Sequence, residues 1–149
     1  MNSISRDKLQ AEFAPKTGCE WYPGDFKATV RTADATFHFN SEGQTCYREI
    51  ADSGRRHLDN RTVDQSFRGA GLFLGVGRET LPGKYPMDIN TLDRAAVVFE
   101  KGLYLVAVVG TINVIKNDES GMSGLFEGTA VSDGVSYKFE GGEFSLKLK

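Results

Sequence analysis

Hydrophobic and polar residues alternate along much of this chain, and a period of two is the pattern of half-buried β-strands. Phe26, Ala28 and Val30 alternate with polar neighbours, and the stretch 35–40 repeats the pattern. Gly, Asn, Asp and Pro residues separate such stretches at intervals of roughly 8–12 residues, as in β-sandwiches and barrels. The predicted strands are 26–32, 35–40, 45–50, 68–77, a short piece ending at Ile89, 95–100, 103–109, 110–116, 122–130, 135–139 and 143–148.

Three segments depart from this alternation. Ser5 is a candidate N-cap for a short helix over Arg6–Phe13, within the N-terminal segment 1–20, because apolar residues four apart share one helical face there. Residues 51–66 are polar and have no period, so we expect one long loop, of a length that is usually functional or disordered. Glu140-Gly141-Gly142 is expected to be the turn between the last two strands.

The spacing of the strands indicates the fold class. No stretch with helical periodicity separates them, which argues against a parallel α/β sheet. The chain has 149 residues, 40% of them hydrophobic, which is enough for one domain with a sizeable core. We predict an all-β fold, an antiparallel β-sandwich or flattened barrel with a short N-terminal helix, in a single domain over 1–149.

Charge and hydropathy narrow the possible functions. The net charge of −2 is unlike that of a protein that grips nucleic acid or an anionic membrane. The longest apolar run, Leu103–Val109, is far shorter than the ~20 residues of a membrane-spanning helix. Charged residues interrupt every candidate apolar core of a signal peptide near the start. We expect a soluble cytoplasmic protein, with an already removed signal sequence as the alternative.

The cysteines and histidines offer little to a metal or cofactor. Cys19 and Cys46 are too few for a disulfide framework and are expected to be free thiols, with one bridge as the alternative in an exported protein. His38 and His57 are the only imidazoles, and the sequence has no Cys-x-x-Cys or His-x-x-x-His pair. We therefore predict no metal and no cofactor.

The C-terminal half carries a recurring arrangement of strands and turns. Gly124-Leu125-Phe126 and Gly142-Glu143-Phe144 each begin a Gly-x-Phe strand, Asn117-Asp118 is a turn before the first, and Gly83-Lys84-Tyr85 lies upstream. Over residues 80–149 this pattern resembles small uncharacterised bacterial β-domains, often lipoproteins, that end in paired Gly-x-Phe strands. The resemblance implies an antiparallel β fold and brings no catalytic residues with it.

The sequence lacks the usual arrangements for catalysis. His38 lies between two Phe residues on a predicted strand and is expected to face solvent, while His57 follows two arginines that make it a poor proton acceptor. The Gly-x-Ser-x-Gly elbow of hydrolases is missing. The glycines of 68–77 lie in a strand-like run that no helix follows, which excludes a dinucleotide fingerprint. We predict that the chain is not an enzyme.

Arginines cluster in the first half of the chain. Five of them fall within 48–68, mixed with acidic residues, and arginine is favoured at protein interfaces for its planar fork. Trp21-Tyr22 upstream offers aromatic anchors. The alternative is that these aromatics cap the sheet core and the loop is merely solvated. The candidate partner surface consists of Trp21, Tyr22, Arg48, Arg55, Arg56, His57, Arg61 and Arg68.

These features predict a non-enzymatic module that binds another protein by occlusion, such as an immunity protein or a phage-type inhibitor. Two alternatives remain open. One is a lipocalin-like barrel for a small molecule or lipid, lined by the strand 68–77. The other is a structural or assembly subunit, in which a sheet edge such as 103–115 pairs with a second copy.

Overall fold

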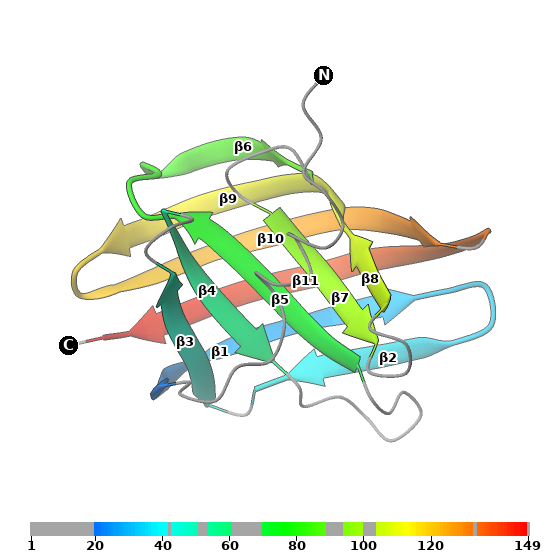
Figure 1. Cartoon of the computed structure of the whole chain (residues 1–149), viewed down its shortest axis with the longest axis horizontal. Coiled ribbons are helices and arrows are strands. Elements are labelled where there is room, and N and C mark those ends of the chain that lie inside the picture. The colour runs from blue at the N-terminus through cyan, green and yellow to red at the C-terminus, as the bar shows by residue number, and fades with distance from the viewer. Residues whose placement is uncertain are drawn as a thin grey trace.

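The computed structural model describes residues 20–41, 43–50, 54–60, 70–88, 94–99, 104–132 and 134–148. Eleven strands and no helix occur in these residues (Figure 1). The strands are β1 (Glu20–Arg31), β2 (Thr36–Asn40), β3 (Gln44–Ile50), β4 (Arg55–Asn60), β5 (Ala70–Gly77), β6 (Gly83–Met87), β7 (Arg94–Phe99), β8 (Tyr104–Ala107), β9 (Val109–Asp118), β10 (Gly121–Ser132) and β11 (Val135–Lys147). The all-β prediction is confirmed, and the helix expected over Arg6–Phe13 lies outside the described residues.

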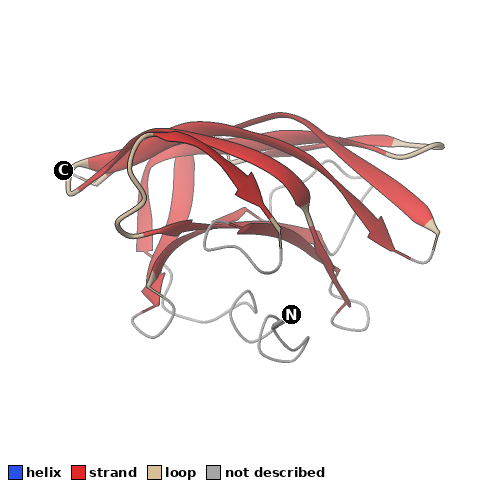
Figure 2. Ribbon diagram, turned by 90° about the horizontal axis from the view of Figure 1, so that it is seen from above, coloured by secondary structure: helices blue, strands red, loops and turns tan. Residues whose placement is uncertain are grey.

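The strands pair antiparallel in one curled sheet. Its order is β6-β9-β10-β11-β1-β3-β4-β5-β7-β8, and β2 also pairs with β1. The sheet forms a half-barrel of two curved layers that face each other (Figure 2). The β9–β11 layer holds β6, β9, β10, β11, β2 and most of β1, and the β3–β5 layer holds β3, β4, β5, β7, β8 and the start of β1.

Strand β1 belongs to both layers. Its first residues, Glu20–Pro23, pair with β3, and Gly24–Arg31 pair with β11. At the bend, the N–H of Gly24 (φ 153°) donates to the carbonyl of Gly43 over 3.0 Å. A Cβ at position 24 would lie 1.9 Å from the carbonyl oxygen of Ser145. Only glycine permits this approach, so Gly24 is the corner of the sheet.

The hydrophobic core lies between the two layers. The rings of Phe26 and Phe126 meet near its centre, with centroids 6.0 Å apart. Leu58 and Leu74 face them from the β3–β5 layer and are fully buried. Val108, also fully buried, lies where the chain passes from β8 into β9. In the β9–β11 layer the inward positions are apolar and alternate with exposed ones, as the period of two predicts.

The loop expected over 51–66 is wrong for 55–60. These residues form β4, which pairs with β3 on one side and β5 on the other. Arg56, His57 and Leu58 are consecutive and all buried, so both faces of this strand are covered. A strand buried on both faces shows no hydrophobic alternation, which is why the sequence pattern did not indicate it.

Two further expectations about strand limits are wrong. Glu140-Gly141-Gly142 is not a turn but a bulge inside the continuous strand β11. The expected edge over 103–115 is not an edge along β9, because β9 pairs with both β6 and β10. Only β8, which ends the strand order, is terminal in that stretch.

Asn117 joins the ends of the two layers. Its Nδ2 donates to the carbonyl oxygens of Gly77 (2.9 Å) and Thr80 (3.0 Å), and its Oδ1 accepts from Nη1 of Arg56 (3.0 Å). Arg56 also donates to the carbonyl of Asp118 over 2.8 Å. Because a buried guanidinium needs such partners, this cluster fastens the β9–β10 hairpin to β4 and to the β5–β6 connection. We call it the Asn117 clamp.

Replacing Asn117 with Ala should destabilise the protein by about 2–4 kcal/mol, because a buried cation and two carbonyls lose a partner. Urea denaturation followed by circular dichroism measures this. Asn113→Ala, on the exposed side of the same strand, is the matched control and should change the free energy of unfolding by less than about 0.5 kcal/mol. Equal unfolding midpoints for the two variants would contradict the clamp.

Cys46 is disulfide-bonded, so the expectation of two free thiols is wrong. The one other cysteine of the sequence is Cys19. Cys46 is 4% exposed and lies opposite Trp21 in the β1–β3 pair. The bond therefore lies at the strand pair that joins the two layers.

Reduction of this bond, or Cys46→Ser, should lower the free energy of unfolding by about 2–4 kcal/mol, because the unfolded chain loses a constraint. Urea unfolding with and without dithiothreitol measures the effect. The variant should be insensitive to dithiothreitol. An unchanged wild-type midpoint under reducing conditions would refute the stabilising role.

Candidate functional site

The residues of the expected partner surface do not form one exposed set. Trp21 on β1 is 64% exposed, and Tyr22 is half-buried. Arg48 on β3 and Arg56 and His57 on β4 are buried, with 8%, 7% and 0% of their surface exposed. Of the five, Trp21 is therefore the one that a partner can reach most fully.

For the other members of that set the structure describes no side chain. The backbone of Arg55 lies in β4, and Arg61 and Arg68 lie outside the described residues. Arg56 is committed to the Asn117 clamp, and its Nε lies 3.7 Å from a carboxylate oxygen of Glu49. The guanidinium that was expected to pair with a partner therefore holds this fold together.

The start of β1 and the strand beside it form what we call the Trp21 corner, made of Glu20, Trp21, Tyr22, Tyr47 and Glu49. The Tyr22 and Tyr47 rings meet edge to face, with centroids 5.8 Å apart. The Tyr22 hydroxyl donates to Glu20 over 2.6 Å, and the Tyr47 hydroxyl donates to Glu49 over 2.9 Å. The hydrogen bond to Glu20 raises the pKa of Tyr22, and burial raises that of Tyr47. Both hydroxyls therefore stay protonated donors.

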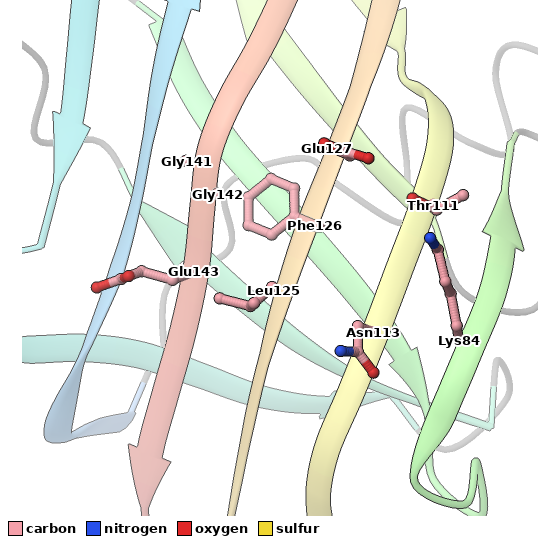
Figure 3. A pocket seen from close by; sticks show the side chains of 9 residues that line it. All are labelled: Lys84, Thr111, Asn113, Leu125, Phe126, Glu127, Gly141, Gly142 and Glu143. Carbon is pink, nitrogen blue, oxygen red and sulfur yellow. The ribbon is translucent and has the colours of Figure 1, made fainter.

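A hollow on the outer face of the β9–β11 layer has no counterpart in the sequence predictions. It has a volume of about 320 Å³ and crosses β6, β9, β10 and β11 (Figure 3). The strand register aligns one residue from each strand in a row across it: Lys84, Asn113, Leu125 and Glu143. We call this hollow the trough. Its lining is Lys84, Thr111, Asn113, Leu125, Phe126, Glu127, Gly141, Gly142 and Glu143.

The bulge in β11 shapes the trough. The register between β10 and β11 shifts between Phe126 and Gly128. Gly141 adopts a left-handed conformation (φ 60°), and no atom lies within 4 Å of where its Cβ would be. A Cβ on Gly142 would lie 2.4 Å from the Phe126 carbonyl oxygen. The two glycines therefore leave a gap in the outer surface above the Phe126 ring.

A second hollow continues from this gap toward β1 and β2. It has a volume of about 280 Å³, shares Gly141 with the trough, and is called here the β1–β2 hollow. Thr29 Oγ1 and His38 Nδ1 are 3.0 Å apart in it. Lys27 Nζ lies 2.9 Å from Glu143 Oε1, so an ion pair links the two hollows. The remaining lining residues are Ala28, Phe39 and Asn40.

These arrangements suit binding better than catalysis. Within the ranges that the structure describes, no group of three or more His, Cys, Asp or Glu residues could hold a metal ion. The Thr29–His38 pair lies on an open sheet face, without the water-excluding enclosure in which nucleophilic groups are activated. The same ranges contain no helix long and apolar enough to cross a membrane.

Comparison with known proteins gives no relative from which a role could be transferred. No protein-family model, no curated protein and no solved structure matches the chain. The resemblance to small bacterial β-domains that end in paired Gly-x-Phe strands therefore stays a prediction.

Glu140, beside the bulge, makes the stability of the protein depend on pH through its ion pairs on the outer face. Its carboxylate accepts from Arg31 Nε over 2.6 Å and lies 3.3 Å from Lys138 Nζ. These hydrogen bonds lower the pKa of Glu140 below its ordinary value of 4.5. A carboxylate with a lowered pKa in the folded state stabilises the protein above that ordinary value, and the contribution is lost as pH falls below it.

Glu140→Gln should therefore make stability less sensitive to acid. Between about pH 5 and about pH 3 the urea midpoint of the wild type should fall further than that of the variant. Glu127→Gln, which removes a carboxylate that joins no ion pair among the described residues, should keep the wild-type slope. Parallel curves for Glu140→Gln and the wild type would disprove the linkage.

Proposed function

We propose that this protein is a non-enzymatic protein-binding module that contacts its partner through the Trp21 corner. The observation that carries the proposal is the 64% exposure of Trp21, the single tryptophan of the chain, on a paired strand. Leaving a large apolar ring in water does not stabilise the fold. Tryptophan is enriched among the residues that dominate protein–protein binding energy, so binding a partner would explain the exposed ring.

The surroundings of Trp21 support this proposal because they fix the strand that presents it. Tyr22 and Tyr47 pack edge to face behind the strand. Glu49 is 44% exposed at its side chain and lies 3.5 Å from Arg78 Nη2. These side chains lie on the face of β1 opposite to Trp21, because consecutive residues of a strand alternate between faces, so they brace the strand from behind. A fixed strand also lowers the entropy cost of binding.

Binding here would act by occlusion. The Trp21 ring would fill an apolar pocket of the partner. Arg48 and Arg56 have no part in this mechanism, because both are buried. An immunity protein or a phage-type inhibitor would use a surface of this kind against its target.

A lipocalin-like ligand chamber is the alternative that part of the strand order favours, since β3, β4 and β5, and likewise β9, β10 and β11, follow one another along the chain as in up-and-down barrels. The space between the layers is nevertheless filled by Phe26, Phe39 and Phe139, which are 0%, 1% and 1% exposed. The trough and the β1–β2 hollow both open on the outer face. The interior therefore gives a ligand chamber no support among the described residues.

A photo-crosslinking residue in place of Trp21 should capture the partner in an extract of the native cell, because the side chain at this position would lie inside the interface. Mass spectrometry identifies the adduct. The same residue in place of Val131, which is 67% exposed on β10, is the matched control and should not capture that protein. Identical adducts from both positions would show that the capture is unspecific.

With the captured protein purified, Trp21→Ala should weaken the complex roughly 30-fold or more, as the loss of about 2 kcal/mol from a binding hot spot does. Isothermal titration calorimetry measures the dissociation constant. Val131→Ala should bind as the wild type does. Wild-type affinity of Trp21→Ala would eliminate this corner as the contact surface.

A further inference from the structure

We propose that the trough and the β1–β2 hollow together form a second site, which binds a neutral polyhydroxylated chain such as an oligosaccharide. The two hollows meet at Gly141 on the same outer face. Together they cross six neighbouring strands, from β6 to β2. At the usual spacing between strands this is a width of roughly 24 Å, enough for several sugar rings in a row. Trp21 lines neither hollow, so this site is independent of the Trp21 corner.

The lining is rich in side chains that donate or accept hydrogen bonds. Lys84, Asn113 and Glu127 are exposed and join none of the ion pairs that cross this face within the described residues. Thr29 and His38 add a hydroxyl and an imidazole at the other end. Each hydroxyl of a sugar both donates and accepts, so this mixture of donors and acceptors matches it.

The charges of the lining cancel, which bears on the class of ligand. The two positive charges of Lys27 and Lys84 balance the two negative charges of Glu127 and Glu143. Lys27 and Glu143 form an ion pair, with Nζ and Oε1 2.9 Å apart. A site for nucleic acid or another polyanion needs an excess of positive charge, and a site for a polycation needs the reverse. A neutral ligand therefore fits this surface best.

The apolar part of the trough is small. Leu125 is 48% exposed, and the Phe126 ring lies buried below it. Sites for lipids and drug-like molecules are lined mainly by apolar side chains, which this one is not. Leu125 is the apolar side chain that would contact the C–H face of a sugar ring.

The position of the site within the sheet weighs against a peptide. Extended peptides bind a sheet by adding a strand at its edge through main-chain hydrogen bonds. The centre of the site lies over β10 and β11, each of which already pairs with a strand on both sides. A ligand there meets only side chains, which are spaced one per strand across the row, as suits a chain of repeating polar units.

The test is an NMR titration of the full-length, nitrogen-15-labelled protein with cellohexaose, maltohexaose, xylohexaose and chitohexaose, each to several millimolar. At least one of these sugars should shift the backbone amides of Thr111, Asn113, Glu127 and Thr29 together and saturably. If none does, or if a sulfated heparin hexasaccharide shifts them when the neutral sugars do not, the proposal is wrong.

Gly141→Asn blocks the site without a steric reason to unfold the chain. Asparagine tolerates the left-handed conformation of this position, and no atom lies within 4 Å of the new Cβ. Because the new side chain fills the junction of the two hollows, affinity for the sugar should fall about tenfold or more. Gly134→Asn is the matched control, since position 134 has φ 76° and equally open surroundings between β10 and β11. Equal affinities of the two variants would overturn the assignment, and their NMR spectra show directly that both are folded.

Discussion

The structure depends on one strand being hydrogen-bonded in two layers. β1 pairs with β3 over its first residues and with β11 and β2 over the rest, so its bend at Gly24 sets how the layers face each other. The Gly24 backbone lies too close to Ser145 for a Cβ, and the hydroxyls of Thr45 and Ser41 donate to the Gly24 carbonyl, so the bend uses no side chain of β1 itself. The side chains of β1 are therefore free for other uses. Trp21 faces solvent, Phe26 enters the core, and Lys27 joins the ion pair on the outer face.

Three strands away from Gly24, in the same row of paired residues, the layers meet through polar side chains. A buried cation costs stability unless it is fully paired, so Arg56 is useful only because Asn117 and the Asp118 carbonyl meet it there. This contact changes the interpretation of the arginine cluster over 48–68, which the sequence predicts to be a partner surface. Arg56 serves the closure of the fold, and the same holds for its neighbour Glu49, which lies between Arg56 and Arg78. Among the described side chains of the expected surface, Trp21 is the one left most accessible to a partner.

Sequence periodicity predicts the strands that have one buried and one solvent-exposed face. It succeeds at Phe26–Val30, where burial alternates, and fails at Arg56-His57-Leu58, where both faces are covered. Sequence periodicity does not predict the trough, for a different reason. Thr111 and Asn113 are ordinary outward positions of a strand, and only the register with β6 and β10 brings them beside Lys84 and Glu127. Pairings between strands that are distant in the chain leave no mark on local composition.

The bulge of β11 determines both the packing of the core and the shape of the trough. Phe139 and Phe144 are five residues apart, so in a regular strand they would point to opposite faces. Both are buried between the layers, which requires an extra residue in the strand between them. Gly141 takes the left-handed conformation there, and its missing side chain leaves the outer face open. The same insertion that directs two phenylalanines inward thus makes the hollow outside, so the residue that opens the proposed ligand site is one that the packing of the core already requires.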